Sequence, residues 1–224
     1  MPDEVSQERD VRGTLAEAAI VAGLTVGLPL ALTLGRWRGA MNEFGDRRLL
    51  TTLAAELILA VCIVPVLVRF RGWRPNEIAG SPGPIDILRG ASLWLSAFVA
   101  YYASALAWLV FVPAMSQGKN AFVPTGHAAT WVIILTSIVS PMFEEFLFLG
   151  YGVARFPERL RKRASMASVA LRTALHLYQG SMAVIGILPL GIVFTLYYYR
   201  TRRLWPVVVA HIAFDAIGLA AILR

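Results

Sequence analysis

Long apolar blocks, separated by short loops that carry arginine, run through almost the whole of this chain of 224 residues. Hydrophobic residues make up 57% of the sequence and charged residues only 16%, and the mean hydropathy is +0.62. This composition is too apolar for an ordinary soluble domain, and blocks of about 20 apolar residues are typical of membrane-spanning helices. The sequence therefore predicts an all-α fold, a polytopic transmembrane helical bundle with about seven or eight membrane helices.

Seven apolar segments underlie this prediction. The fifth is short for a full crossing, so we expect a buried or half-inserted helix there. The sixth contains Pro189 between Gly186 and Gly191, which favours a kink. A short interfacial helix is expected over residues 85–89, directly after a turn rich in proline and glycine. The seven segments are residues 14–34, 49–68, 90–115, 129–156, 165–179, 182–199 and 204–223.

The net charge of +7 comes largely from arginines that flank these segments. Arginines in such positions set the orientation of a membrane protein, and their uneven distribution over the loops predicts a cytoplasmic N-terminus. We therefore expect the lipid bilayer, and no nucleic acid, among the partners of the chain. Cys62 is the single cysteine, so no intramolecular disulfide can form.

Two adjacent carboxylates, Glu144 and Glu145, lie inside an apolar run. A charged side chain at the centre of a membrane helix costs about 2.5–3.5 kcal/mol, so the pair needs a cavity, partners or protonation. His176, His211 and Asp215 also lie in apolar segments, at depths that overlap that of Glu144 when each helix is measured from its basic end. The sequence therefore predicts that Glu144, His176, His211 and Asp215 meet in one buried polar site.

The spacing of these residues suggests their roles. Glu144 and Glu145 point about 100° apart on a helix, so one should be catalytic and the other structural. His211 and Asp215 are four residues apart and share a face, so the aspartate is expected to accept a hydrogen bond from the imidazole. Two further residues are interpreted more simply: Glu56 as a polar group paired with a neighbouring helix, and His127 as a solvated loop residue.

Several functions are compatible with these side chains. Glu144 could take a proton from a water that attacks an amide, with the histidines holding the oxyanion. The same four groups could instead bind zinc, although no His-Glu-x-x-His motif is present. A transporter with an intramembrane proton relay is another possibility, and polar residues that only cross-link helices are the simplest one.

Residues 130–219 resemble the CPBP family of intramembrane proteases, which includes the type II CaaX prenyl endopeptidases and bacterial proteins related to abortive infection and bacteriocin immunity. Three short motifs carry the resemblance. The family's Glu-Glu-x-x-x-Arg with a following Gly corresponds to residues 144–150, its Phe-x-x-x-His to residues 172–176, and its His-x-x-x-Asn or Asp to residues 211–215. The resemblance implies a CPBP-like catalytic core over residues 129–224 and N-terminal helices over residues 1–128, within a single membrane domain of residues 1–224.

The resemblance also implies roles for the site residues. Glu144 corresponds to the general base, aided by His176, and His211 and Asp215 to the groups that stabilise the tetrahedral intermediate. Family members are described both as glutamate-type proteases, which need no cofactor, and as metalloproteases, so zinc held by the same four residues stays open.

Two positions depart from the family pattern. Leu149 stands where the family has arginine, and Arg172 stands where it has phenylalanine. We hypothesise a swap in which Arg172, from the neighbouring helix, pairs with Glu145. The alternative is that Arg172 extends to the cytoplasmic surface.

We accordingly expect an intramembrane endopeptidase that cuts a membrane-associated or lipid-anchored protein near its membrane-proximal C-terminal part. The bacterial inner membrane is the expected location, since arginine greatly outnumbers lysine, as in proteins from GC-rich genomes. The alternative is a non-proteolytic membrane scaffold, or a bacteriocin-immunity or abortive-infection factor.

Overall fold

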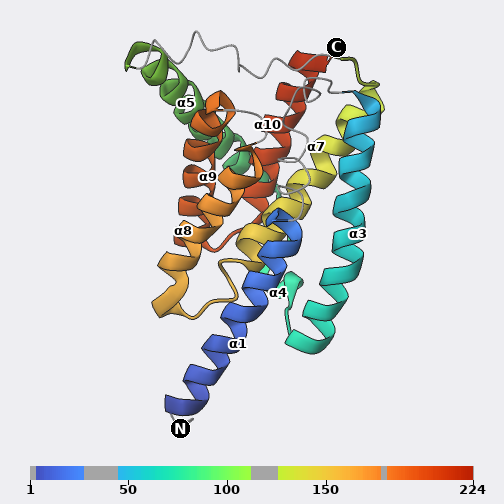
Figure 1. Ribbon diagram of the computed structural model, residues 1–224. Helices are drawn as coiled ribbons and strands as arrows, with labels where there is room; N and C mark the ends of the chain where they lie inside the picture. The colour runs from blue at the N-terminus through green and yellow to red at the C-terminus, as the bar shows by residue number, and fades with distance from the viewer. Residues whose placement is uncertain (1–3, 28–44, 112–125, 178–180, 224) are drawn as a thin grey trace.

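The computed structural model describes residues 4–27, 45–111, 126–177 and 181–223, and the regular structure of these residues is entirely helical. The helices stand side by side as one bundle, with the two chain termini at opposite ends (Figure 1). In chain order they are α1 (Glu4–Ala22), η1 (Gly23–Gly27), α3 (Asp46–Arg71), α4 (Pro75–Ala79), α5 (Pro84–Phe111), α7 (Thr130–Glu145), η2 (Phe146–Tyr151), α8 (Glu158–Leu175), α9 (Ser181–Thr201) and α10 (Trp205–Leu223).

Five helical stretches in the described part of the chain are long and apolar enough to cross a membrane. A shorter apolar stretch, Gly13–Gly27, covers the end of α1 and η1. The predicted helical membrane bundle is therefore confirmed. The five stretches are Asp46–Phe70, Pro84–Phe111, Thr130–Tyr151, Val184–Thr201 and Trp205–Leu223.

The helix α5 packs closely against α9 and α10 because glycines stand at the contacts. A Cβ atom at Gly90 would lie 2.5 Å from a side-chain carbon of Val209, and one at Gly186 would lie 2.1 Å from the ring of Tyr101. Small residues let membrane helices approach in this way without a hydrophobic driving force between them. The core that results is apolar and joins these three helices to η2.

The helix that carries the two glutamates is shorter than predicted. A continuous segment was expected over residues 129–156, but α7 ends at Glu145 and a wider π-helical turn, η2, follows it. At its end the amide of Gly152 donates to the carbonyl of Leu147 at 2.8 Å, and a Cβ atom at Gly152 would lie 2.6 Å from the carbonyl oxygen of Phe148. Glycine thus permits the close turn, and π-helical turns of this kind are frequent at functional sites.

Other boundaries also differ. The fifth segment was expected to begin at residue 165, but α8 begins at Glu158, because Pro157 has a φ of −61° that suits a helix start and arginine and lysine are good helix formers. Residues 85–89 are the first turns of α5 and not a separate interfacial helix. The first segment is helical from Glu4 to Gly27. Residues 28–34, 112–115 and 178–179 of the predicted segments lie outside the described residues.

Candidate active site

Glu145, the last residue of α7, is the centre of a buried polar network. Its side chain is fully buried, and both its oxygens accept hydrogen bonds from Arg172, Oε1 from Nη1 at 2.6 Å and Oε2 from Nη2 at 2.7 Å. The Nδ1 atom of His211 lies 2.6 Å from the same Oε1 atom, so it donates to the carboxylate. A two-point contact between guanidinium and carboxylate is the strongest kind of ion pair. Glu145 therefore joins α7, α8 and α10 at one point.

The surroundings of Arg172 explain how α8 holds a buried cation. The side chain is 1% exposed, and its guanidinium carbon lies 5.2 Å from the ring centre of Phe148 and 6.0 Å from that of Phe194. Aromatic faces attract a cation that has lost its water. The pairing expected between Arg172 and Glu145 is thus present, and the alternative, an arginine that reaches the surface, does not apply.

Glu144 has a different environment from its neighbour. Its side chain is half-buried, and its Oε2 atom is shielded from solvent but has no hydrogen-bond partner in the described part of the chain. A buried carboxylate oxygen without a partner is costly, so such an atom calls for an explanation such as a bound water or substrate. The two glutamates therefore differ: Glu145 has its hydrogen bonds made, and Glu144 has an oxygen without a partner in the described residues.

The expected hydrogen bond from His211 to Asp215 is not formed. The distance from Nε2 of His211 to Oδ1 of Asp215 is 3.6 Å, which is too long for a hydrogen bond. The imidazole instead donates from Nδ1 to Glu145, which approaches from another helix. His211 and Asp215 share one face of α10, as predicted, but Glu145, whose carboxylate is closer, orients the ring.

His176 caps the C-terminal end of α8 and is half-buried. Its Nδ1 atom lies 2.9 Å from the carbonyl oxygen of Arg172, one turn earlier. Because a carbonyl oxygen only accepts, Nδ1 carries the proton, and Nε2 of a neutral ring is then left as an acceptor. This is the tautomer that a proton-accepting histidine needs.

Glu56 is a further acid near the site that the sequence motifs did not include. It lies on α3 and accepts a hydrogen bond from Oγ of Ser140 at 2.7 Å, which agrees with the expected pairing to a neighbouring helix. Ser140 is one helical turn before Glu144 on α7, so Glu56 faces the same side of that helix. Only its place in an apolar segment signalled Glu56 in the sequence. His127 is an exposed loop residue, as predicted.

The predicted site residues come together in space. Asp215 interacts electrostatically with His211, Glu144 and His176, and Glu56 with Glu144, Asp215 and His211. Side chains from α3, α7, α8 and α10 thus converge on one region inside the bundle. The charges in it are mixed, with several carboxylates around Arg172 and two imidazoles.

A metal ion would need several donor side chains gathered around one position. In the residues that the structure describes, no three His, Cys, Asp or Glu side chains are arranged to hold one. Glu144, His176, His211 and Asp215 were the ligands to be expected of a zinc site. Nδ1 of His211 donates to Glu145, as the second ring nitrogen of a metal-ligating histidine commonly does, and its Nε2 lies 3.6 Å from Asp215. The four side chains are, however, not gathered around a common metal position in the described residues.

A comparison with known protein families finds a match over the region that carries the site. Residues 126–217 match the family model "Type II CAAX prenyl endopeptidase Rce1-like". The chain is also 34% identical over 83 residues to NADH-quinone oxidoreductase subunit N of Cereibacter sphaeroides (strain ATCC 17025 / ATH 2.4.3), a stretch that covers 37% of this chain and 17% of that protein. The chain spans less than a fifth of that relative, so the similarity carries no assignment of function.

No solved structure matches the chain. The family match covers α7, η2 and α8 completely and includes Glu144, Glu145, Arg172, His176, His211 and Asp215. Glu56 lies outside it. Residues 126–217 of this integral membrane protein are therefore similar to the family described as Rce1-like, which supports membership of the CPBP family at the level of this region.

Proposed function

We propose that the protein is an intramembrane endopeptidase in which Glu144 activates the attacking water. The observation that carries the proposal is the shielded Oε2 atom of Glu144, which has no hydrogen-bond partner in the described residues. Asp215 interacts electrostatically with both Glu144 and His176, which supports their closeness. A general base must have a free oxygen within reach of the water that it deprotonates. Glu145 lacks one, because Arg172 and His211 use both of its oxygens.

The proposed reaction proceeds through a tetrahedral intermediate. Glu144, assisted by Nε2 of His176, takes a proton from water as the water oxygen bonds to the carbonyl carbon of the scissile peptide. His211, oriented by Glu145 at Nδ1, donates from Nε2 to the oxyanion, with Asp215 3.6 Å from the same nitrogen. The carbon–nitrogen bond then breaks, and the proton held by Glu144 passes to the leaving amine.

Glu145 and Arg172 serve as positioning residues in this scheme. Their ion pair is buried and touches α7 and α8, and Glu145 also holds His211 of α10. The pair therefore fixes the spacing between the base and the oxyanion-binding histidine. Neither side chain has to exchange a proton with the substrate.

The substrate proposed is a membrane-associated or lipid-anchored protein, cut near its membrane-proximal C-terminal part. The name of the matched family supports this class, since it describes endopeptidases that act on prenylated CAAX proteins. We further propose the bacterial inner membrane with a cytoplasmic N-terminus. The uneven distribution of basic residues over the loops supports that orientation.

Cleavage of a farnesylated CAAX peptide by the purified full chain tests this proposal. Loss of a general base lowers a rate by about 100-fold or more, so Glu144→Gln should cut the peptide at least that much more slowly than wild type. Glu77→Gln is the matched control, because Glu77 is an exposed glutamate paired with Arg74 outside the site. Equal rates for Glu144→Gln and wild type would contradict the proposed base. A folded wild type that cuts neither this peptide nor any membrane protein would favour the scaffold.

A further inference from the structure

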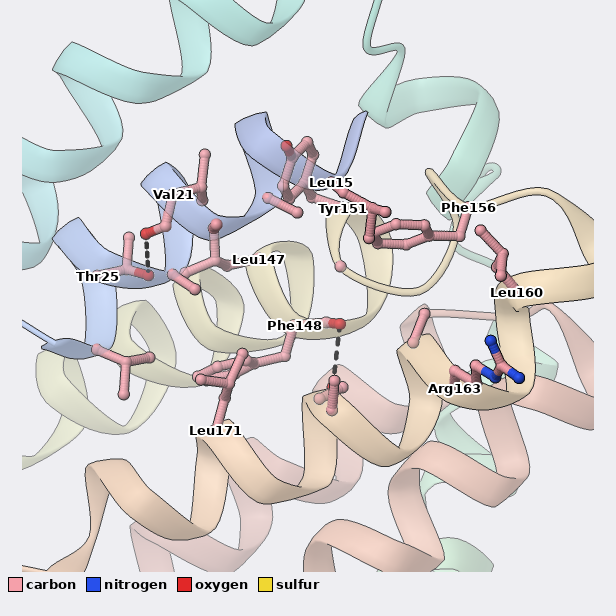
Figure 2. Close-up of a pocket in the computed structure, with 18 residues that line it drawn as sticks. Leu15, Val21, Thr25, Leu147, Phe148, Tyr151, Phe156, Leu160, Arg163 and Leu171 are labelled. Atoms are coloured by element: carbon pink, nitrogen blue, oxygen red, sulfur yellow. Dashed lines mark hydrogen bonds between the residues drawn. The ribbon is translucent and has the colours of Figure 1, made fainter. Parts of the chain in front are cut away.

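A cavity of about 400 Å³ lies between α1, η2 and α8 (Figure 2). Its volume is within the range of small-molecule sites, about 300–1,000 Å³. None of Glu144, Glu145, His176, His211 and Asp215 is among its lining residues, so it is separate from the candidate active site. The residues that line it are Leu15, Ala18, Ala19, Val21, Ala22, Thr25, Val26, Leu147, Phe148, Tyr151, Gly152, Phe156, Leu160, Arg163, Ala164, Ala167, Ser168 and Leu171.

The wall of the cavity is apolar even where its residues carry hydroxyl groups. Thr25 donates to the carbonyl of Val21 at 2.7 Å, and Ser168 donates to the carbonyl of Phe148 at 3.1 Å, so both hydroxyl protons are used by the protein (Figure 2). Small side chains on α1 and on α8 leave the space open. This part of the wall offers little to a polar ligand and suits a hydrocarbon chain.

Arg163 is the one charged residue among those that line the cavity. Its side chain is exposed and has no hydrogen bond or ion pair within the described part of the chain. Figure 2 shows it beside Leu160 at one end of the cavity, while Thr25 and Leu171 lie at the other. The cavity therefore has an apolar interior and a free cation at one end only.

We propose that this cavity binds an anionic phospholipid, with an acyl chain among the apolar side chains and the headgroup phosphate at Arg163. The protein is embedded in lipid, and an amphiphile with a hydrocarbon tail and a negative head matches both the apolar wall and the position of the cation. The proposal does not depend on proteolysis, because it concerns binding at a different place.

Photo-crosslinking tests the site directly. The full chain is reconstituted in phosphatidylcholine vesicles that contain a trace of a lipid with a diazirine in one acyl chain. This photoreactive lipid is phosphatidylglycerol in one preparation and phosphatidylcholine in the other, and the labelled peptides are identified by mass spectrometry. Phosphatidylglycerol should label residues 15–26 and 160–171 about fivefold more than phosphatidylcholine does. A preference of about this size corresponds to the attraction of one basic residue at the membrane surface for an anionic lipid. Arg163→Gln should remove this preference, whereas Arg159→Gln, which changes the charge equally but does not line the cavity, should keep it.

A second pair of variants tests the cavity itself. Ala167→Phe should fill it and reduce labelling of these peptides by both lipids, whereas Met166→Phe, at an exposed neighbouring position outside the lining, should not. Equal labelling of wild type by the two lipids, or a preference that survives Arg163→Gln, would overturn the proposal. Loss of labelling when a farnesylated peptide is added would also overturn it, because the cavity would then belong to the substrate.

Discussion

Arg172 and Glu145 form the polar centre around which the proposed catalytic residues are arranged. Each charge alone would be costly to bury, since water is lost and nothing replaces it. Together they are neutral, with two hydrogen bonds between them, and His211 occupies a further position on the carboxylate. The pair should therefore contribute to the geometry of the site as much as to the stability of the bundle.

Removal of one partner should be far more harmful than removal of both. Arg172→Leu should destabilise the protein by about 3–5 kcal/mol, because Glu145 is left buried and unpaired, and the double variant Glu145→Leu with Arg172→Leu should recover most of that loss. Thermal unfolding of the purified protein in detergent measures both effects. Arg74→Leu, at an exposed ion pair, is the control and should change little. A wild-type unfolding temperature for Arg172→Leu would show that the pair contributes nothing.

At the scale of elements, the π-helical turn η2 determines how Phe148 packs against α8. The π-helical turn η2 begins directly after Glu145, and Phe148 within it packs against Arg172. Ser168 of α8 donates to the carbonyl of Phe148, which ties η2 to the helix that carries His176. A regular α-helix through these residues would rotate Phe148 and the residues after it away from α8.

Gly152 should be essential for this turn. A methyl group there would lie 2.6 Å from the carbonyl oxygen of Phe148, a backbone atom that cannot move without disturbing η2. Gly152→Ala should therefore lower both the unfolding temperature and the rate of peptide cleavage. The matched control is Gly218→Ala on α10, which has open space for a Cβ atom and should be neutral or slightly stabilising. If Gly152→Ala behaved like Gly218→Ala in both measurements, η2 would not need its glycine.

For the molecule as a whole, the sequence predicts the bundle and the convergence of the site better than its contacts. Hydropathy identified the membrane helices, and the two departures at Leu149 and Arg172 identified the ion pair with Glu145. The predicted hydrogen-bond partner of His211 was wrong, because spacing along one helix reveals Asp215 but not Glu145, which lies on another helix. Glu56 was not assigned to the site because no motif surrounds it. The π-helical turn η2 was not predicted because its first residues, Phe-Leu-Phe-Leu, resemble those of any apolar helix.

The arrangement of the helices also predicts membrane topology. The termini lie at opposite ends of the bundle (Figure 1), so they should lie on opposite faces of the membrane, with the N-terminus cytoplasmic. In a bacterial host, a C-terminal alkaline phosphatase fusion should be active, because the enzyme folds outside the cytoplasm, and a C-terminal fluorescent-protein fusion should be dark. An inactive phosphatase fusion with a fluorescent C-terminal fusion would place the C-terminus in the cytoplasm and would contradict this topology.

The most direct test of the central claim, that Glu144 activates water for peptide hydrolysis, is a comparison of protein C-termini in membranes. Cells that express wild type, Glu144→Gln or the control Glu77→Gln at equal levels would be compared by C-terminal mass spectrometry. We expect a set of new C-termini in cells with wild type and Glu77→Gln that is absent from cells with Glu144→Gln, and these termini would identify the substrates. The same new C-termini in cells with Glu144→Gln would contradict the claim.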